Sequence, residues 1–335
     1  MRVRASVRGI VLPAGGSRAS TRGIAVPAGL GRLYFAAQAG AGAAWWVAVF
    51  TVPLVREATL GTIDPTLMAL ADVPLFVVAS ALAAVGVRGA AYVATGWTLL
   101  VAAALAVYAT ITTEAGWGVL AMIAASAASV VALCAIRWGR IPTAWVVQGP
   151  FGFRPAAAGR SSAAHVLATL GQIVLFWGFF LVVVPLVISA LEQRWGVALP
   201  LPAPVATGVA IAGAVVLALA SALGLWSGVT MSALGDGTPL PAAMTTRLVV
   251  AGPYRWVRNP MALAGITQGA AVGLLLGSWL VVLYAVAGSA VWNHVVRPHE
   301  EHDLEARFGA DFDEYRAHVR CWLPRLTPYR SVPPR

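Results

Sequence analysis

Long, almost uncharged apolar runs recur along the whole chain and are separated by short polar segments. A membrane-crossing helix needs roughly 20 apolar residues, and most of these runs have about that length. Their apolar residues are continuous rather than alternating, which argues against a membrane β-barrel. The pattern therefore predicts an all-α, polytopic helical membrane protein with about eight transmembrane helices. The expected spans cover residues 33–55, 66–87, 89–112, 117–137, 165–190, 204–231, 261–277 and 279–296.

Composition supports this fold class. The chain has 335 residues, of which 59% are hydrophobic and only 11% are charged, whereas soluble domains carry about 25% charged residues. Membrane topology and contacts with anionic lipid headgroups explain the net charge of +10. Basic and aromatic residues do not interleave as they do in nucleic-acid sites, so no nucleic-acid partner is expected. Cys134 and Cys321 lie far apart without neighbouring ligand residues, so neither a disulfide nor a metal site is predicted.

Arginine-bearing segments alternate along the chain with arginine-poor ones. The N-terminal arm, the turn at Arg88, and the segments 137–164, 232–260 and beyond 297 carry most of the arginines. Because positively charged loops stay on the cytoplasmic side of a membrane, this alternation places both termini in the cytoplasm. We expect an integral, multi-pass protein, with a bacterial plasma membrane as its location.

Four regions follow from these patterns. Residues 1–31 are rich in Arg, Gly, Pro and Ser and are predicted to form a disordered basic arm. Residues 32–140 form an N-terminal four-helix transmembrane region whose role the sequence does not reveal. Proline and glycine residues mark 141–164 as a cytoplasmic linker. Residues 165–330 form the second transmembrane region, together with a cytoplasmic tail.

The tail beyond residue 301 has a helical pattern of its own. Its apolar residues recur at steps of three or four, which is typical of one helix face. Gly309 interrupts this pattern, and Asp311 is expected to cap the second piece. We predict an amphipathic C-terminal helix that lies over the cytoplasmic face as a lid; a solvated charged tail is the alternative. The face consists of Leu304, Phe308, Phe312, Tyr315 and Val319.

Two polar stretches flank the uncharged hairpin 261–296. The first, residues 252–260, contains two arginines, Arg255 and Arg258, that suit a carboxylate or a phosphate. Pro260 disfavours helix at the residue before it, and irregular backbone at membrane depth persists where it lines a cavity. The alternative is an ordinary juxtamembrane loop whose arginines only hold topology.

The second polar stretch begins at Arg297 and contains the adjacent carboxylates Glu300 and Glu301. Two carboxylates at a membrane border are costly unless a cation or a hydrogen-bond donor meets them. A helix end entering water is the alternative. Since a helical hairpin returns the chain to its starting face, both polar stretches are expected to meet at one cavity. Asp72, near the outer end of the second span, is expected to be interfacial and solvated; a functional site within the membrane is the alternative.

These stretches together carry a resemblance. GPYRWVRNP at 252–260, the hairpin, and EEHDLEARFGADFDEYRAHVRCWLPR at 300–325 resemble the isoprenylcysteine carboxyl methyltransferase and phospholipid methyltransferase family of integral membrane methyltransferases. That family has a GxYxxxRHPxY stretch, a helical hairpin, and an EE pair leading to LxxxFGxxYxxY and a terminal WLP. The resemblance covers about residues 245–326. Asn259 replaces the His of the signature, and Ala262 replaces its second Tyr.

The resemblance implies a site for S-adenosylmethionine at the cytoplasmic ends of these helices, closed by the tail. Glu300 would hold the cofactor from the side opposite the loop. Arg297 would orient the acceptor, and Glu301 or His294 would accept a proton from an amine. Arg258, singled out above for anion binding, joins the cofactor set. The other cofactor-lining positions would be Leu248, Val249, Tyr254, Asn259, Pro260 and Met261.

The predicted function is S-adenosylmethionine-dependent methyl transfer to a lipid-like or isoprenoid substrate at the cytoplasmic membrane face. The acceptor atom belongs to a carboxylate, an amine or a hydroxyl group. One alternative is an NADPH-dependent membrane reductase of the sterol or steroid type, because such enzymes resemble this chain in an RHPxY-like stretch and an aromatic tail. Another is a non-catalytic membrane scaffold, which the replacements at Asn259 and Ala262 would suit.

Overall fold

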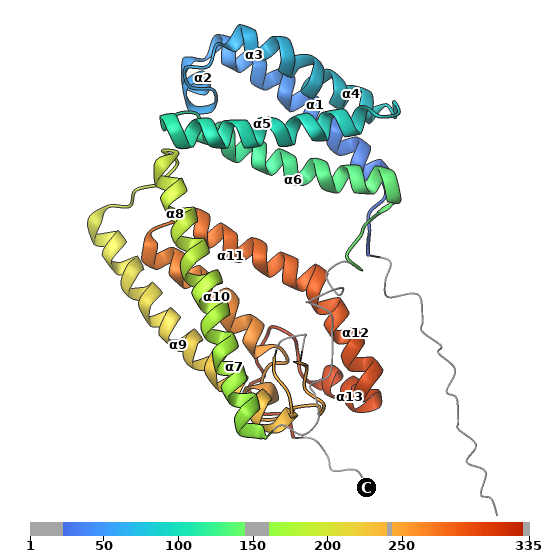
Figure 1. Ribbon diagram of the computed structural model, residues 1–335, viewed down its shortest axis with the longest axis vertical. Coiled ribbons are helices and arrows are strands. Elements are labelled where there is room, and N and C mark those ends of the chain that lie inside the picture. The colour runs from blue at the N-terminus through green and yellow to red at the C-terminus, as the bar shows by residue number, and fades with distance from the viewer. Residues whose placement is uncertain (1–22, 145–160, 240–242, 331–335) are drawn as a thin grey trace, which may run out of the picture.

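A computed structural model describes residues 23–144, 161–239 and 243–330. Nearly all of its regular structure is helical, which confirms the all-α class. The N-terminal helices form one bundle, drawn in blue to green in Figure 1. Its elements are α1 (Ala28–Thr51), α2 (Pro53–Thr59), α3 (Pro65–Asp72), the π-helical segment η2 (Val73–Val78), α4 (Ala79–Ala84), α5 (Ala90–Thr112) and α6 (Gly116–Trp138).

The C-terminal helices form a second group below this bundle in Figure 1. Two of its helices are long and continue through π-helical segments. The elements are α7 (Ser162–Trp177) with η5 (Gly178–Val183) and α8 (Val184–Arg194), then α9 (Ala203–Gly235), η7 (Gly252–Arg255) and α10 (Pro260–Leu276), then α11 (Trp279–Val291) with η8 (Trp292–Val296) and α12 (Arg297–Phe308), and finally α13 (Ala310–His318).

Seven of the described helices are long and apolar enough to cross a membrane, so the chain is a multi-pass membrane protein. The seventh predicted span corresponds to α10, which is not among these seven helices. It has 17 residues and rises only about 26 Å. The hairpin turn is where the sequence places it. Gly277, with φ of 59°, ends α10, and the Ser278 hydroxyl accepts a hydrogen bond from the first turn of α11.

Several predicted boundaries need correction. Residues 23–31, assigned to a disordered arm, instead contain strand β1 (Ile24–Ala25) and the start of α1. β1 pairs in antiparallel fashion with β2 (Arg140–Ile141), because the two segments meet at the ends of α1 and α6. Helix α7 begins inside the predicted linker. The rest of the predicted arm and linker lies outside the described residues.

The loops at the two ends of the helices gather as the arginine pattern predicts. At one end, Arg194 donates hydrogen bonds to two carbonyls that close α5, and the Trp279 indole donates to the carbonyl of Val197. At the other end, the segment after α6 reaches α12 through a hydrogen bond between Thr143 and His299. The segments predicted to share a membrane face therefore lie together. Which face is cytoplasmic stays a prediction.

Two acidic residues differ from their predicted surroundings. Asp72, expected to be solvated, is only 5% exposed. Its carboxylate accepts hydrogen bonds from the indoles of Trp46 and Trp97. Glu192, assigned to a loop, lies in the last turn of α8 and is buried. It accepts hydrogen bonds from Ser278 and the backbone of Leu280, and so ties α8 to the hairpin turn.

The tail forms the predicted lid over the irregular loop 243–260. Gly309 separates α12 from α13, but Asp311 does not cap α13, because its N-cap is Gly309 and no side chain accepts a cap bond. The apolar face of the lid packs on Leu248 and Val250 of the loop. Its buried residues are Phe312, Tyr315 and Val319, flanked by Leu304 and Phe308.

Candidate functional site

The loop before α10 takes its irregular shape from glycine and proline. Gly252 has φ of 52°, which a residue with a side chain rarely adopts. Pro253 is the second residue of the single turn η7 (Gly252–Arg255), where it needs no hydrogen-bonded N–H. Asn259 is non-helical, with ψ of 64°, and Pro260 begins α10 directly after it. The loop therefore stays open on one side and leaves the Asn259 side chain beside the start of the hairpin.

A cavity of about 380 Å³ opens beside this loop. Its volume lies in the range of small-molecule and cofactor sites, about 300–1,000 Å³. The walls come from α7, from the end of α9, from the loop and the first turn of α10, and from η8 and α12. Asn259 and Glu300, from opposite ends of the hairpin, both line it. The remaining lining residues are Thr169, Gln172, Ile173, Phe176, Met231, Pro239, Met244, Tyr254, Pro260, Met261, Ala262, Trp292 and Val296.

A smaller chamber of about 60 Å³ adjoins the larger one, and its far wall is the lid. The two chambers share Tyr254, Asn259 and Glu300 among their lining residues. The structure therefore brings all eight predicted cofactor positions to one two-part cavity. Pro260 and Met261 line the large chamber alone, and the small chamber alone is lined by Leu248, Val249 and Arg258.

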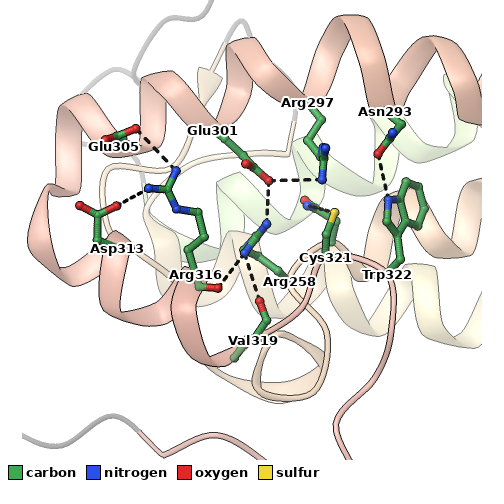
Figure 2. Close-up of polar contacts among 11 residues, drawn as sticks. Arg258, Asn293, Arg297, Glu301, Glu305, Asp313, Arg316, Val319, Cys321 and Trp322 are labelled. Atoms are coloured by element: carbon green, nitrogen blue, oxygen red, sulfur yellow. Dashed lines mark hydrogen bonds and ion pairs between the residues drawn. The ribbon is translucent and has the colours of Figure 1, made fainter.

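Arg258 joins the loop, α12 and the lid. Its guanidinium donates to the Glu301 carboxylate at 2.8 Å and to the carbonyls of Arg316 and Val319 at 3.2 and 3.1 Å. Figure 2 shows this fan of contacts at the end of α13. The Arg258 Nε is buried and has no hydrogen-bond partner among the described residues. Most of the guanidinium is thus engaged in closing the lid, and the Nε is left without a partner.

The segment after α13 wraps around the same loop. The Tyr315 hydroxyl donates to the carbonyl of Tyr254 at 2.7 Å, and Arg255 donates to the carbonyl of Tyr329. The Asn259 amide donates to the Cys321 sulfur at 3.3 Å, which leaves its carbonyl oxygen available to the cavity. Trp322 completes the enclosure by donating to Asn293 on η8, as Figure 2 shows.

Glu300 is the carboxylate at the centre of the cavity wall. The apolar part of its helix ends before Arg297, so Glu300 lies outside the membrane-spanning segment. Burial raises the pKa of the Glu300 carboxyl to about 7. The negative charges of Glu301 and Asp303 add to the rise, and Arg307 opposes it. Neither a hydrogen bond nor an ion pair neutralises Glu300 within the described part of the chain, so its charge is available to a ligand.

The two predicted catalytic residues, Arg297 and Glu301, lie on α12 with Glu300. Glu301 is held by Arg258 and faces Arg297 at 4.0 Å. Glu301 lines the small chamber, whereas Arg297 lines neither chamber, although its Nε is buried and lacks a partner among the described residues. His294 lines a separate polar cavity on another side of α12. Their catalytic roles stay predictions.

Several lining residues were not predicted. Met231, Met244 and Phe176 supply apolar walls, and Thr169 supplies a hydroxyl that is hydrogen-bonded to Ser232. All four are ordinary residues within apolar runs or beside them, so no spacing or charge marks them. Ala262 also lines the large chamber. The missing ring at this position therefore leaves space in the cavity itself.

The fold and the cavity define a polytopic helical membrane protein with a cofactor-sized site whose walls are mostly apolar and carry a few charged residues. Residues 207–311 match the family model of the phospholipid methyltransferases. This match confirms, over these residues, the resemblance to the isoprenylcysteine carboxyl and phospholipid methyltransferase family of membrane methyltransferases. Searches of curated proteins and of solved structures gave no match.

Proposed function

We propose that the protein transfers a methyl group from S-adenosylmethionine to a lipid-like or isoprenoid acceptor at the cytoplasmic membrane face. The single observation that carries this proposal is the two-part cavity that Asn259 and Glu300 share. The family match supports methyl transfer as the reaction. The NADPH reductase alternative lacks such support.

The residues around the cavity fit the cofactor. S-adenosylmethionine, when bound, supplies an electrophilic sulfonium methyl together with an ammonium, a carboxylate, ribose hydroxyls and an adenine ring. The unneutralised Glu300 suits the cationic or hydroxyl groups. Arg258, which lines the small chamber, suits an anionic one. Apolar walls at Met231, Met244 and Val249 suit the ring and exclude water.

An apolar groove of about 220 Å³ offers a path for the acceptor. Phe176 lines both this groove and the large chamber. Gly265, Gly269 and Gly288 on α10 and α11 keep the groove open, because they place no side chain in it. We propose that the lipid chain lies here, and that its polar end reaches the chamber beside Glu300. For an amine or hydroxyl acceptor, Glu301 is the carboxylate proposed to receive the proton.

Labelled-methyl transfer into a lipid extract tests this proposal. The full-length protein in nanodiscs is incubated with methyl-tritiated S-adenosylmethionine and the extract. We expect label in lipid with the wild type, a loss of at least about tenfold for Glu300→Ala, and little change for the matched control Glu57→Ala, an exposed carboxylate in the N-terminal bundle. No incorporation at any pH, or equal incorporation by Glu300→Ala, would contradict it.

A binding comparison separates the two cofactor classes. Calorimetry with S-adenosylmethionine and with NADPH is run on the same nanodisc sample. We expect S-adenosylmethionine to bind and Glu300→Ala to weaken it. NADPH binding without S-adenosylmethionine binding would favour the reductase.

A further inference from the structure

A second cavity lies inside the N-terminal bundle, in the region for which the sequence shows no role. Its volume is about 410 Å³, and α1, α2, α3, η2, α5 and α6 form its walls. These elements can be followed at the top of Figure 1. Most lining residues are apolar, among them Leu60, Met68, Phe76, Leu105 and Met122. The cavity is comparable in volume to the larger chamber of the methyltransferase site.

One carboxylate faces this apolar space. Asp72 lines the cavity and is only 5% exposed. One of its oxygens accepts the Trp46 indole N–H at 2.9 Å, and the other accepts the Trp97 indole N–H at 2.6 Å. Both oxygens accept a hydrogen bond and neither donates one within the described residues, which is the arrangement that suits an ionised carboxylate. Each oxygen retains a further lone pair.

The cavity contains no positive charge to balance Asp72. Neither Arg nor His occurs among its lining residues within the described ranges. Charged groups within a membrane are costly and are normally paired, and indole N–H groups are neutral donors. A cation inside the cavity would therefore gain a charge-assisted contact that the protein does not satisfy itself. The charge of Asp72 selects for cations, and the apolar walls select for an apolar body.

Local backbone structure gives a separate indication. The segment η2 starts at the residue after Asp72 and has Pro74 as its second residue. Single turns of π-helix inside α-helices occur frequently at functional sites. Gly42 on the facing helix α1 allows the close approach of the Phe76 ring, because a Cβ at this position would lie 2.8 Å from that ring. The π-helical turn and the Gly42–Phe76 contact thus both lie in the cavity wall that contains Asp72.

The mouth of the cavity lies between α1 and α6. Ala37 and Ala41 on α1 and Ala121 on α6 line it and are exposed. In a membrane protein these exposed alanines face lipid, so an apolar molecule would enter sideways from the bilayer. The phenol of Tyr34, bonded to Gln38 and to the carbonyl of Ala125, also lines the cavity and lies about three turns along α1 from Trp46, the partner of Asp72.

We propose that the N-terminal bundle is a binding module for an apolar organic cation, with Asp72 as its counter-charge. The site is separate from the methyltransferase cavity and shares no lining residue with it. The proposal therefore stands or falls independently of the proposed function.

Binding of tritiated tetraphenylphosphonium tests the proposal. The full-length protein is placed in phosphatidylcholine nanodiscs, and empty nanodiscs give the background. Tetraphenylborate, an anion of the same shape, is the charge control. We expect saturable binding of the cation and none of the anion. Asp72→Asn is expected to weaken cation binding by about tenfold or more, and the exposed control Glu57→Gln to leave it unchanged.

A second variant keeps the test decisive if Asp72→Asn does not fold. Ala121→Phe narrows the mouth without touching the carboxylate, and should abolish binding of the cation. Ala104→Phe, an exposed position on α5 away from the cavity, is its matched control and should bind normally. Equal cation binding by Ala121→Phe and the wild type, binding of both ions alike, or no saturable binding would overturn the proposal. Unchanged binding in folded Asp72→Asn would show that the carboxylate only ties three helices together.

Discussion

Substituting Arg258 by Ala is expected to release the C-terminal lid. The side chain is only 10% exposed and its partner Glu301 only 19%, so the variant leaves a mostly buried carboxylate with a single guanidinium, that of Arg297, at 4.0 Å. It also removes the donor from two carbonyls at the end of α13. Breaking a buried ion pair by removing one partner costs about 3–5 kcal/mol.

The loss concerns the docking of α13 rather than the whole chain. A decrease of about 3 kcal/mol in the free energy of lid opening raises its open fraction on the order of 100-fold. Hydrogen exchange of lid amides follows this fraction, because exchange there requires local opening. We expect peptides spanning 310–323 to exchange about 100-fold faster in Arg258→Ala, while peptides of α5 and α6 stay unchanged.

Two controls make the measurement specific. Arg247→Ala breaks an ion pair of similar length, 3.0 Å, whose side chains are 72% and 40% exposed; exposed pairs contribute about 0–1 kcal/mol. Arg258→Lys keeps a positive charge but loses the forked donor geometry, and should fall between Ala and the wild type. Lid exchange in Arg258→Ala within threefold of the wild type, or as fast in Arg247→Ala, would refute this reasoning.

Three further predictions concern stability. Burial raises the pKa of the Glu300 carboxyl to about 7 in the folded protein. The unfolding free energy of the ligand-free protein should therefore fall as pH rises from about 4.5 to 7 and then level off. Thermal unfolding of Glu300→Gln should lack this decline. Glu192→Ala removes the acceptor that joins α8 to the hairpin turn and should lower the unfolding temperature, whereas an unchanged value would show that the contact is dispensable. Gly118→Ala would place a Cβ 2.0 Å from the Thr59 carbonyl oxygen and should destabilise the bundle, while Gly96→Ala, with nothing within 4 Å, should not.

The helical pattern and the cofactor positions could be predicted because each depends on local sequence. Continuous apolar runs fix spanning helices, and the hairpin 261–296 must return the chain to its starting face. That constraint alone brings Asn259 and Glu300 together. The resemblance then supplied the neighbouring positions, and all eight line the two-part cavity.

The partners of individual charges could not be predicted. Arg258 was expected to contact a ligand, but its guanidinium meets two carbonyls of the lid and the Glu301 carboxylate, and backbone acceptors leave no mark in a sequence. Asp72 was expected in water because its partners, two tryptophans, count as apolar residues in any periodicity. Burial of a charge depends on contacts distant along the chain, which local patterns do not report.

The most direct test is a structure of the full-length protein in a nanodisc with S-adenosylmethionine. We predict density for the cofactor in the two-part cavity, between the Asn259 side chain and the Glu300 carboxylate, with the lid closed over it. Cofactor density at any other place, or an empty cavity at a saturating concentration, would contradict the proposed site.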